Sequence, residues 1–138
     1  MIAGKENITD LIPQRSPFVM IDSLLYADDE KAISSFEVQS ANLLLKNGTL
    51  SASALIENIA QTAAAHAGYK FRQNNEPVKL GFIGAVDNVV VQELPVAGAK
   101  LKTEIEVINN VFNVTIIRGK VTSGEQELMQ CKMKIFMQ

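Results

Sequence analysis

The stretch from Leu50 to Gly68 constrains the fold more than any other part of the chain. Between Ala52 and Ala67 the side chains are almost all small and apolar, with Glu57 as the only acid and His66 as the only imidazole. Alanine is the best helix former, and a helix that is apolar on nearly every side is buried on nearly every side. The sequence therefore predicts a central helix whose carboxylate is costly to bury unless it is paired or used.

Alternating apolar and polar residues elsewhere predict strands. Before the helix, a short helical turn capped by Thr9 or Asp10 is expected over residues 7–12, strands are expected over 18–26 and 31–38, and residues 39–49 are predicted to be irregular, with a turn at 46–48. After the helix and a loop at 74–77, strands are predicted over 78–92, 99–108, 112–122 and 127–136. Asn109–Asn110 is the expected hairpin turn between two of them, and a register change is predicted near Arg118–Gly119.

One helix among antiparallel strands predicts an α+β layer architecture. Because the helix is apolar almost all round, a sheet of about five to six strands has to curl around it. That description is the hot-dog fold, here as a single domain over residues 1–138. Hot-dog domains commonly form dimers that cover the remaining side of the helix, so we expect a homodimer or a higher homo-oligomer.

Composition excludes several functions. The net charge of −2 argues against nucleic acid as a partner, because phosphate binding needs a basic face. No run approaches the ~18 apolar residues of a membrane span, and residues 1–10 lack the apolar core of a signal peptide. The single cysteine, Cys131, is expected to be a core thiol in a reducing cytoplasm. With one histidine and one cysteine the chain lacks zinc ligands, so no metal and no cofactor are predicted.

Four separated motifs resemble the small 3-hydroxyacyl-[acyl-carrier-protein] dehydratases. The segment Ile12-Pro-Gln-Arg-Ser-Pro-Phe-Val-Met-Ile-Asp22 is similar to their opening pattern Leu-Pro-His-Arg-x-Pro-Phe, which apolar residues and Asp follow. Leu55-Ile-Glu-Asn-Ile-Ala-Gln61 resembles their active-site helix, Leu-x-x-Glu-Ala-x-Ala-Gln. The other two are Gly81-Phe-Ile-Gly-Ala-Val-Asp87 and Pro95-Val-Ala-Gly-Ala-Lys-Leu101. Gln14 and the helix flanks are more similar to the pigment-type branch, near aryl polyene and flexirubin biosynthesis.

The resemblance implies a dehydratase-like protein that acts on 3-hydroxyacyl thioesters of acyl carrier protein or coenzyme A, in fatty-acid or polyene-type biosynthesis. Glu57 would be its acid, kept protonated because burial raises a carboxyl pKa. The backbone amides near Ala52 and Ser53, at the helix N-terminus, would hold the thioester oxygen. Gln61 lies on the same helix face as Glu57 and could hold the carboxylate. Gly84 is predicted to belong to the substrate-binding set.

The departures from the family pattern decide which chemistry is available. The family carries a catalytic histidine before the helix, and this chain has none there. Asn42 is our preferred counterpart, ahead of Leu43, because it is polar. His66 follows Glu57 by nine residues, so within one subunit it points to the opposite side of the helix, about 13.5 Å along the axis. A structural or interface role is therefore predicted for His66.

Three functions remain open at this point. Dehydration needs a base, which Asn42 cannot be. Thioester hydrolysis needs less, because Glu57 could activate a water that Asn42 orients. Alternatively, the chain is a non-catalytic acyl-binding subunit of a hetero-oligomer whose homologous partner bears the histidine.

Structural roles compete with each of these assignments. Glu57 could simply be tied to a backbone amide or to Gln14, Arg15 or Gln61, and Asn42 could be an ordinary loop residue. Arg15 is expected to pair with Asp22 or with a neighbouring subunit, unless it meets an acidic carrier protein. The glycines at 81 and 84 are expected to permit close packing of strand on helix.

Overall fold

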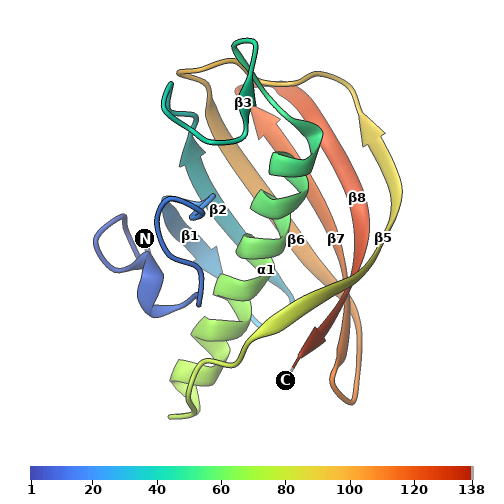
Figure 1. Ribbon diagram of the computed structural model, residues 1–138. Helices are drawn as coiled ribbons and strands as arrows, with labels where there is room; N and C mark the ends of the chain where they lie inside the picture. Colours follow the sequence, from blue (N-terminus) through green and yellow to red (C-terminus); the bar gives the residue numbers. More distant parts are fainter. Residues whose placement is uncertain (138) are drawn as a thin grey trace.

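One long helix, α1 (Ala52–Gln73), lies against a curved six-stranded antiparallel sheet in the computed structural model, which describes residues 1–137 (Figure 1). The strand order is β1-β2-β6-β7-β8-β5. The strands are β1 (Ser23–Ala27), β2 (Lys31–Glu37), β5 (Gly81–Val91), β6 (Lys100–Val111), β7 (Val114–Ser123) and β8 (Gln126–Met137). A 3-10 turn, η1 (Ile8–Asp10), and a small hairpin of β3 (Leu45–Lys46) and β4 (Thr49–Leu50) complete the chain. The predicted α+β hot-dog arrangement is confirmed.

The helix begins where predicted and runs five residues further. Ser51 caps it, because its Oγ accepts a hydrogen bond from the Ala54 amide. Gly68 does not end the helix, which continues to Gln73. A Cβ at Gly68 would lie 2.0 Å from the Leu11 carbonyl oxygen, so the glycine is the point where the N-terminal segment crosses the helix. None of the helices within residues 1–137 is long and apolar enough to cross a membrane.

The core lies between α1 and the inner face of the sheet. Leu55 and Ile59 are fully buried there, and Ile105, Ile117 and Met133 come from three neighbouring strands. On β6 the predicted alternation is confirmed, with Leu101 and Thr103 inside and the lysines beside them outside. Cys131 is buried as predicted, and burial raises the pKa of its thiol to about 11.

The predicted position of the β6–β7 turn is wrong. The turn lies at Phe112–Asn113, not at Asn109–Asn110, and Phe112 has a positive φ of 56°. A register shift does occur near Arg118, because Val107 and Asn109 on β6 pair with the consecutive residues Ile117 and Ile116 on β7. Gly119 occupies an inward-facing position of β7, where a Cβ would lie 2.5 Å from the Ile59 side chain. Because a glycine stands there instead of an apolar side chain, the alternation of apolar and polar residues is hard to see in the sequence of this strand.

The segment before β1 also differs from the prediction. Residues 18–22 do not form a strand; β1 begins only at Ser23. Neither Thr9 nor Asp10 caps η1, which starts after Asn7, and the Asn7 side chain accepts a hydrogen bond from the Gly4 amide instead. Residues 18–22 are instead held by hydrogen bonds from Asn58 and Gln61 of α1. The apolar sequence of the segment gives no sign of these contacts.

Two smaller expectations are also wrong. Within residues 1–137 Arg15 forms no ion pair with Asp22, and its guanidinium donates to the carbonyls of Ile12 and Gln14. Asp22 accepts a hydrogen bond from the Glu37 amide, and burial raises the pKa of its carboxyl. Gly81 and Gly84 do not make room for the helix. A Cβ on Gly84 would strike the Phe136 ring in the neighbouring strand, and one on Gly81 would meet Met137.

The two edges of the sheet are treated differently. Backbone hydrogen bonds between Ala3 and Leu24 cover β1. The other edge is β5, and most of its side chains are exposed, including Phe82, Ile83 and three consecutive valines, Val89 to Val91. A long edge strand with a single charged residue, Asp87, invites pairing with another chain.

We predict that Gly68→Ala destabilises the protein, although helix propensity alone would favour alanine by about 1 kcal/mol. The new methyl group would press on the Leu11 carbonyl, which belongs to the backbone and cannot rotate away. We expect the free energy of unfolding in urea to fall by about 1–3 kcal/mol, as in other overpacked sites. In the control, Gly4→Ala, the nearest atom is 3.6 Å away, so stability should stay within about 0.5 kcal/mol. A more stable Gly68→Ala protein would contradict the close contact.

Candidate functional site

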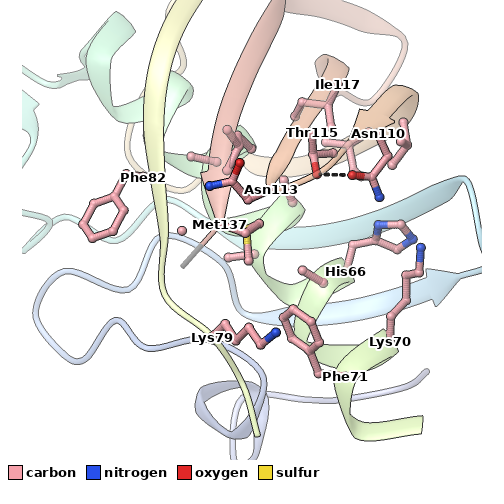
Figure 2. Close-up of a pocket in the computed structure, with 18 of the residues that line it drawn as sticks. His66, Lys70, Phe71, Lys79, Phe82, Asn110, Asn113, Thr115, Ile117 and Met137 are labelled. Carbon is pink, nitrogen blue, oxygen red and sulfur yellow. Dashed lines mark hydrogen bonds between the residues drawn. The ribbon is translucent and has the colours of Figure 1, made fainter. Parts of the chain in front are cut away.

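A groove of about 570 Å³ lies between one face of α1 and the strands β6, β7, β8 and β5 of the sheet. Its helix wall is formed by small residues at helical spacing, Ala60, Ala63, Ala64 and Ala67. Ile105, Ile117 and Ile135 form the sheet wall. Figure 2 shows one end of the groove, where Lys70 and Phe71 project from the helix and Lys79 Nζ lies 5.3 Å from the centre of the Phe71 ring. The alanine and isoleucine walls of the groove are therefore apolar, and polar residues such as Gln14, Glu57, His66 and Asn110 complete its lining.

Glu57 stands at one flank of this groove. It comes from the second turn of α1 and is half-buried, not fully enclosed. Gln61 Nε2 donates to Glu57 Oε1 at 2.8 Å, and this is the only side-chain hydrogen bond to the carboxylate within residues 1–137. Of the three side chains predicted as structural partners of Glu57, Gln61 is the one that binds it.

Gln61 is fully buried and uses all of its strong hydrogen-bonding groups. Its Oε1 accepts from the Met20 amide at 2.6 Å, and its Nε2 donates to the Phe18 carbonyl at 2.8 Å as well as to Glu57. No donor is left over for a ligand. Gln61 therefore holds Glu57 from beneath, and the predicted contact of Gln61 with substrate stays a prediction.

Asn58 was missed at the sequence level and is the second buried amide of the helix. Its Nδ2 donates to the Met20 carbonyl at 2.7 Å, and its Oδ1 accepts from the hydroxyl of Thr103 on β6. Gln61 and Asn58 together bind both backbone groups of Met20. The signal was the presence of two amides, three residues apart, in a helix that is otherwise apolar.

The structure places Asn42 near this site but not in contact with Glu57. Its Oδ1 accepts from the Leu44 amide at 2.8 Å, and its Nδ2 lies 3.5 Å from the sulfur of Met20. Asn42 is not among the residues that line the groove. Within one chain, therefore, the Asn42 carbonyl is already occupied by its own loop.

The other predicted substrate-binding residues differ in whether they are available to a ligand. The backbone amides of Ala52 and Ser53 lie in the first turn of α1 and have no hydrogen-bond partner within residues 1–137, as expected for a helix N-terminus. Gly84 faces Phe136 and does not line the groove. No group of three or more metal-ligating side chains occurs in the described part of the chain.

His66 lies on the opposite flank of the groove from Glu57, as the nine-residue spacing predicts. The residue is 4% exposed, and its Nε2 is 2.6 Å from the Asp28 carbonyl oxygen in the turn between β1 and β2. The predicted structural role is confirmed by this contact. Burial lowers the pKa of His66 below its ordinary value. The carboxylate of Asp28 accepts from the Tyr26 hydroxyl, which together with two backbone amides lowers the Asp28 pKa to about 2.

A family model described as ApeP-like, ApeP dehydratase, matches residues 6–138. The chain belongs to the ApeP-like dehydratase family. This membership confirms both the predicted dehydratase resemblance and the aryl polyene-type branch.

Individual relatives agree with the family. The 3-hydroxyacyl-[acyl-carrier-protein] dehydratase FabZ of Clostridium kluyveri is 26% identical over 130 residues, which cover 90% of this chain and 88% of that protein. Among solved structures, the dehydratase heterocomplex ApeI:P from Xenorhabdus doucetiae matches with a TM-score of 0.90 at 16% identity, covering 95% of this chain and 90% of that chain. A hypothetical thioesterase from Streptococcus pneumoniae, solved with coenzyme A, matches with a TM-score of 0.66 at 10% identity over 84% of each chain. At these identities the structural matches establish the fold alone.

We predict that Gln61→Leu destabilises the protein, because it leaves the Met20 amide and the Phe18 carbonyl without their partner. The free energy of unfolding should fall by about 1–3 kcal/mol, the usual cost of leaving a buried polar group unpaired. Gln73→Leu is the matched control on the same helix, since Gln73 makes only an exposed hydrogen bond to Tyr69. Equal losses in the two variants would show that Gln61 does not hold the segment.

We also predict a pH-dependent contribution of His66 to stability. Because its pKa is lowered in the folded state, the unfolded chain takes up the proton first as pH falls through the ordinary histidine value of about 6.5. Folding is therefore opposed below that pH, and the stability difference between wild type and His66→Gln should shift against wild type as pH falls. Urea unfolding at several pH values measures this shift. The neighbours that also contribute charge are Asp28, Asp29 and Lys70, and an unchanged difference would mean that His66 titrates normally.

Proposed function

We propose that this chain acts on 3-hydroxyacyl thioesters, carried by acyl carrier protein or coenzyme A in the cytoplasm, and that Glu57 supplies the carboxyl group of the reaction. One observation carries the proposal: in a chain of a dehydratase family, Glu57 lies at the flank of an apolar groove and is held there by Gln61. The groove can take an acyl chain, and the carboxyl group remains half-exposed beside it.

Dehydration of such a thioester removes a proton from C2 and hydroxide from C3, so that a C2–C3 double bond forms and water leaves. Glu57, when protonated, can give its proton to the departing hydroxyl. The amides of Ala52 and Ser53 can hold the thioester carbonyl oxygen while negative charge develops on it. The amides of Ala52 and Ser53 have no hydrogen-bond partner within residues 1–137, and the Glu57 side chain is half-exposed, so both groups can reach a substrate.

The C2 proton still needs a base, and residues 1–137 supply none in hydrogen-bond contact with Glu57. Asn42 is an amide with its carbonyl occupied, and His66 lies on the other flank of the groove. We infer that the base comes from another subunit across the β5 edge, which in a hetero-oligomer would be a histidine-bearing homologue. The likeness to a dehydratase heterocomplex supports this assembly, and the exposed apolar side chains of β5 supply a surface for it. A homodimer would use the same edge but would bring no imidazole before the helix.

Thioester hydrolysis is the second candidate function, and the accessibility of Glu57 favours it. A half-buried carboxylate can activate water without a second residue, with the same helix amides polarising the carbonyl. In that reaction water adds to the thioester carbon, the C–S bond breaks, and the thiol leaves with the proton. Asn42 would then orient the water, provided that contact with a neighbouring subunit breaks the hydrogen bond between the Asn42 side chain and the Leu44 amide.

The test is turnover of 3-hydroxyacyl thioesters by the full chain, alone and together with a homologue that carries a histidine before its helix. We expect enoyl thioester to form in the mixture, and Glu57→Gln to slow this reaction by about 10²–10⁴-fold, the usual contribution of one general acid or base. Formation of the enoyl group is followed by ultraviolet absorbance and mass spectrometry.

Glu125→Gln is the control, because Glu125 is an exposed acid in the turn between β7 and β8, away from the groove. Its rate should match wild type. Turnover that survives Glu57→Gln would contradict the proposal. Release of free thiol from a simple acyl thioester, abolished by Glu57→Gln, would favour hydrolysis instead.

A further inference from the structure

The turn of the β6–β7 hairpin lies within a stretch that carries no charge. Residues 107–117, Val-Ile-Asn-Asn-Val-Phe-Asn-Val-Thr-Ile-Ile, contain no acid, lysine, arginine or histidine. The charged residues that border this hairpin tip are Glu106 and Arg118, and they form an ion pair, with Nη1 of Arg118 3.7 Å from Oε1 of Glu106. The hairpin tip lies at the opposite end of the molecule from the β3–β4 hairpin (Figure 1).

Phe112 occupies the apex of the hairpin tip and is 99% exposed. Its backbone has a φ of 56°, a conformation that is rare for bulky residues and that asparagine or glycine adopts more readily. The fold therefore neither buries this ring nor needs a phenylalanine to make the turn. Backbone strain that the fold does not require points to a function, and the exposed ring points to a contact with another surface.

The outer face of the sheet, which points away from α1, continues this apolar surface. Along the ladder Val111 pairs with Val114, Val114 with Phe136, and Phe136 with Phe82. Side chains of paired residues lie on the same face, and Phe136 lies outside because Ile135 before it is buried in the core. Phe136, Phe82 and Val111 are exposed. An apolar row therefore crosses β6, β7, β8 and β5 beside the hairpin tip.

Cations follow this row on the outer face of β7 and β8. The burial of alternate residues directs outward the side chains of Arg118, Lys120, Lys132 and Lys134. No acid occupies an outward position of these two strands between the apolar row and Lys120. Within residues 1–137 the three lysines form no ion pair. Their ammonium groups are therefore available to an anionic surface.

The acids nearest to these cations belong to the neighbouring strands. Glu104 and Glu106 on β6 lie 4.0 and 3.7 Å from Nζ of Lys31, so their charge is partly compensated. Asp87 pairs in register with Lys132 and is the one charged residue of β5. Because the whole chain has a net charge of −2, an attraction to anions has to come from this local group of cations.

An anionic lipid bilayer matches both properties of this surface. The ring of Phe112 can enter the boundary between headgroups and acyl chains. The lysines behind it can lay their aliphatic stems on the bilayer while their ammonium groups meet phosphate. A partner protein fits less well, because a single turn is narrow compared with the ~800 Å² that each partner buries in a standard interface. A bilayer accepts one inserted ring without a shaped pocket.

We propose that the hairpin tip and the cations of β7 and β8 bind the protein peripherally to an anionic lipid bilayer, with Phe112 as the inserted anchor. The binding is reversible, since only one ring and a short apolar row enter the lipid. The inference is independent of the proposed reaction, because neither Glu57 nor the first turn of α1 belongs to this surface.

The test is co-sedimentation of the full chain with lipid vesicles. One set of vesicles consists of phosphatidylcholine and phosphatidylglycerol in equal parts, and the other of phosphatidylcholine alone. We expect the chain to bind the anionic vesicles and to remain in the supernatant with the neutral ones. Raising the salt concentration from about 0.1 M to about 1 M shortens the Debye length from about 10 Å to about 3 Å, so binding should fall.

Phe112→Asn separates the anchor from the fold, because asparagine tolerates the positive φ and the exposed ring contributes no packing. Its unfolding midpoint in urea should stay unchanged or rise. Its affinity for anionic vesicles should fall about ten- to a hundredfold, the loss expected when one phenylalanine no longer leaves water. Lys134→Gln should weaken binding about fivefold. The control is Leu43→Ser, which removes an exposed leucine at the other end of the molecule and should bind as wild type does.

Absence of binding to anionic vesicles, equal binding to neutral vesicles, or binding that Phe112→Asn leaves unchanged would overturn the inference. So would a smaller sedimentation mass of Phe112→Asn in the absence of lipid, because the ring would then be a contact between subunits. No thioester is present in these measurements, so their outcome does not depend on whether Glu57 acts on an acyl chain.

Discussion

The site depends on the way the helix binds the backbone of Met20. Asn58 takes its carbonyl and Gln61 takes its amide, so an extended segment without strand partners is fixed by two side chains of α1. The same Gln61 reaches Glu57 with its remaining hydrogen. The orientation of the carboxyl group is thus coupled to the path of the N-terminal segment. A buried amide with all of its groups bonded is rigid, because each broken bond would leave a polar group unsatisfied.

The helix and most of the strands could be predicted from the sequence, but the positions of turns and close contacts could not. The alanine-rich stretch from Ala52 to Ala67 predicted the helix, and alternation on β6 predicted which of its residues face inward. The turn at Phe112 could not be predicted, because Asn109–Asn110 has the stronger local turn signal. In the observed ladder Val111 pairs with Val114, which puts the turn at Phe112–Asn113. Gly68 likewise looks like a helix terminator until Leu11 is placed beside it.

For the site, residue types were easier to predict than partners. Glu57 stood out because it is the only acid in an apolar helix, and Gln61 because it follows on the same face. Asn58 is equally polar, but its partners are Met20, 38 residues earlier, and Thr103, 45 residues later. Such contacts exist only after the sheet has formed. Asn42 was chosen for its polarity and its place in the family pattern, and neither shows that its carbonyl binds the amide of Leu44.

The edge strand β5 also makes the stability of this fold sensitive to the concentration of any protein that binds it. Its apolar side chains and its single charge leave one side of the sheet without the protection that Ala3 gives to β1. Any chain that binds this edge in the folded state, and not in the unfolded state, adds to stability in proportion to the logarithm of its concentration once it is in excess. If the proposed partner subunit covers β5, the thermal stability of this chain will rise with the amount of that partner in the cell.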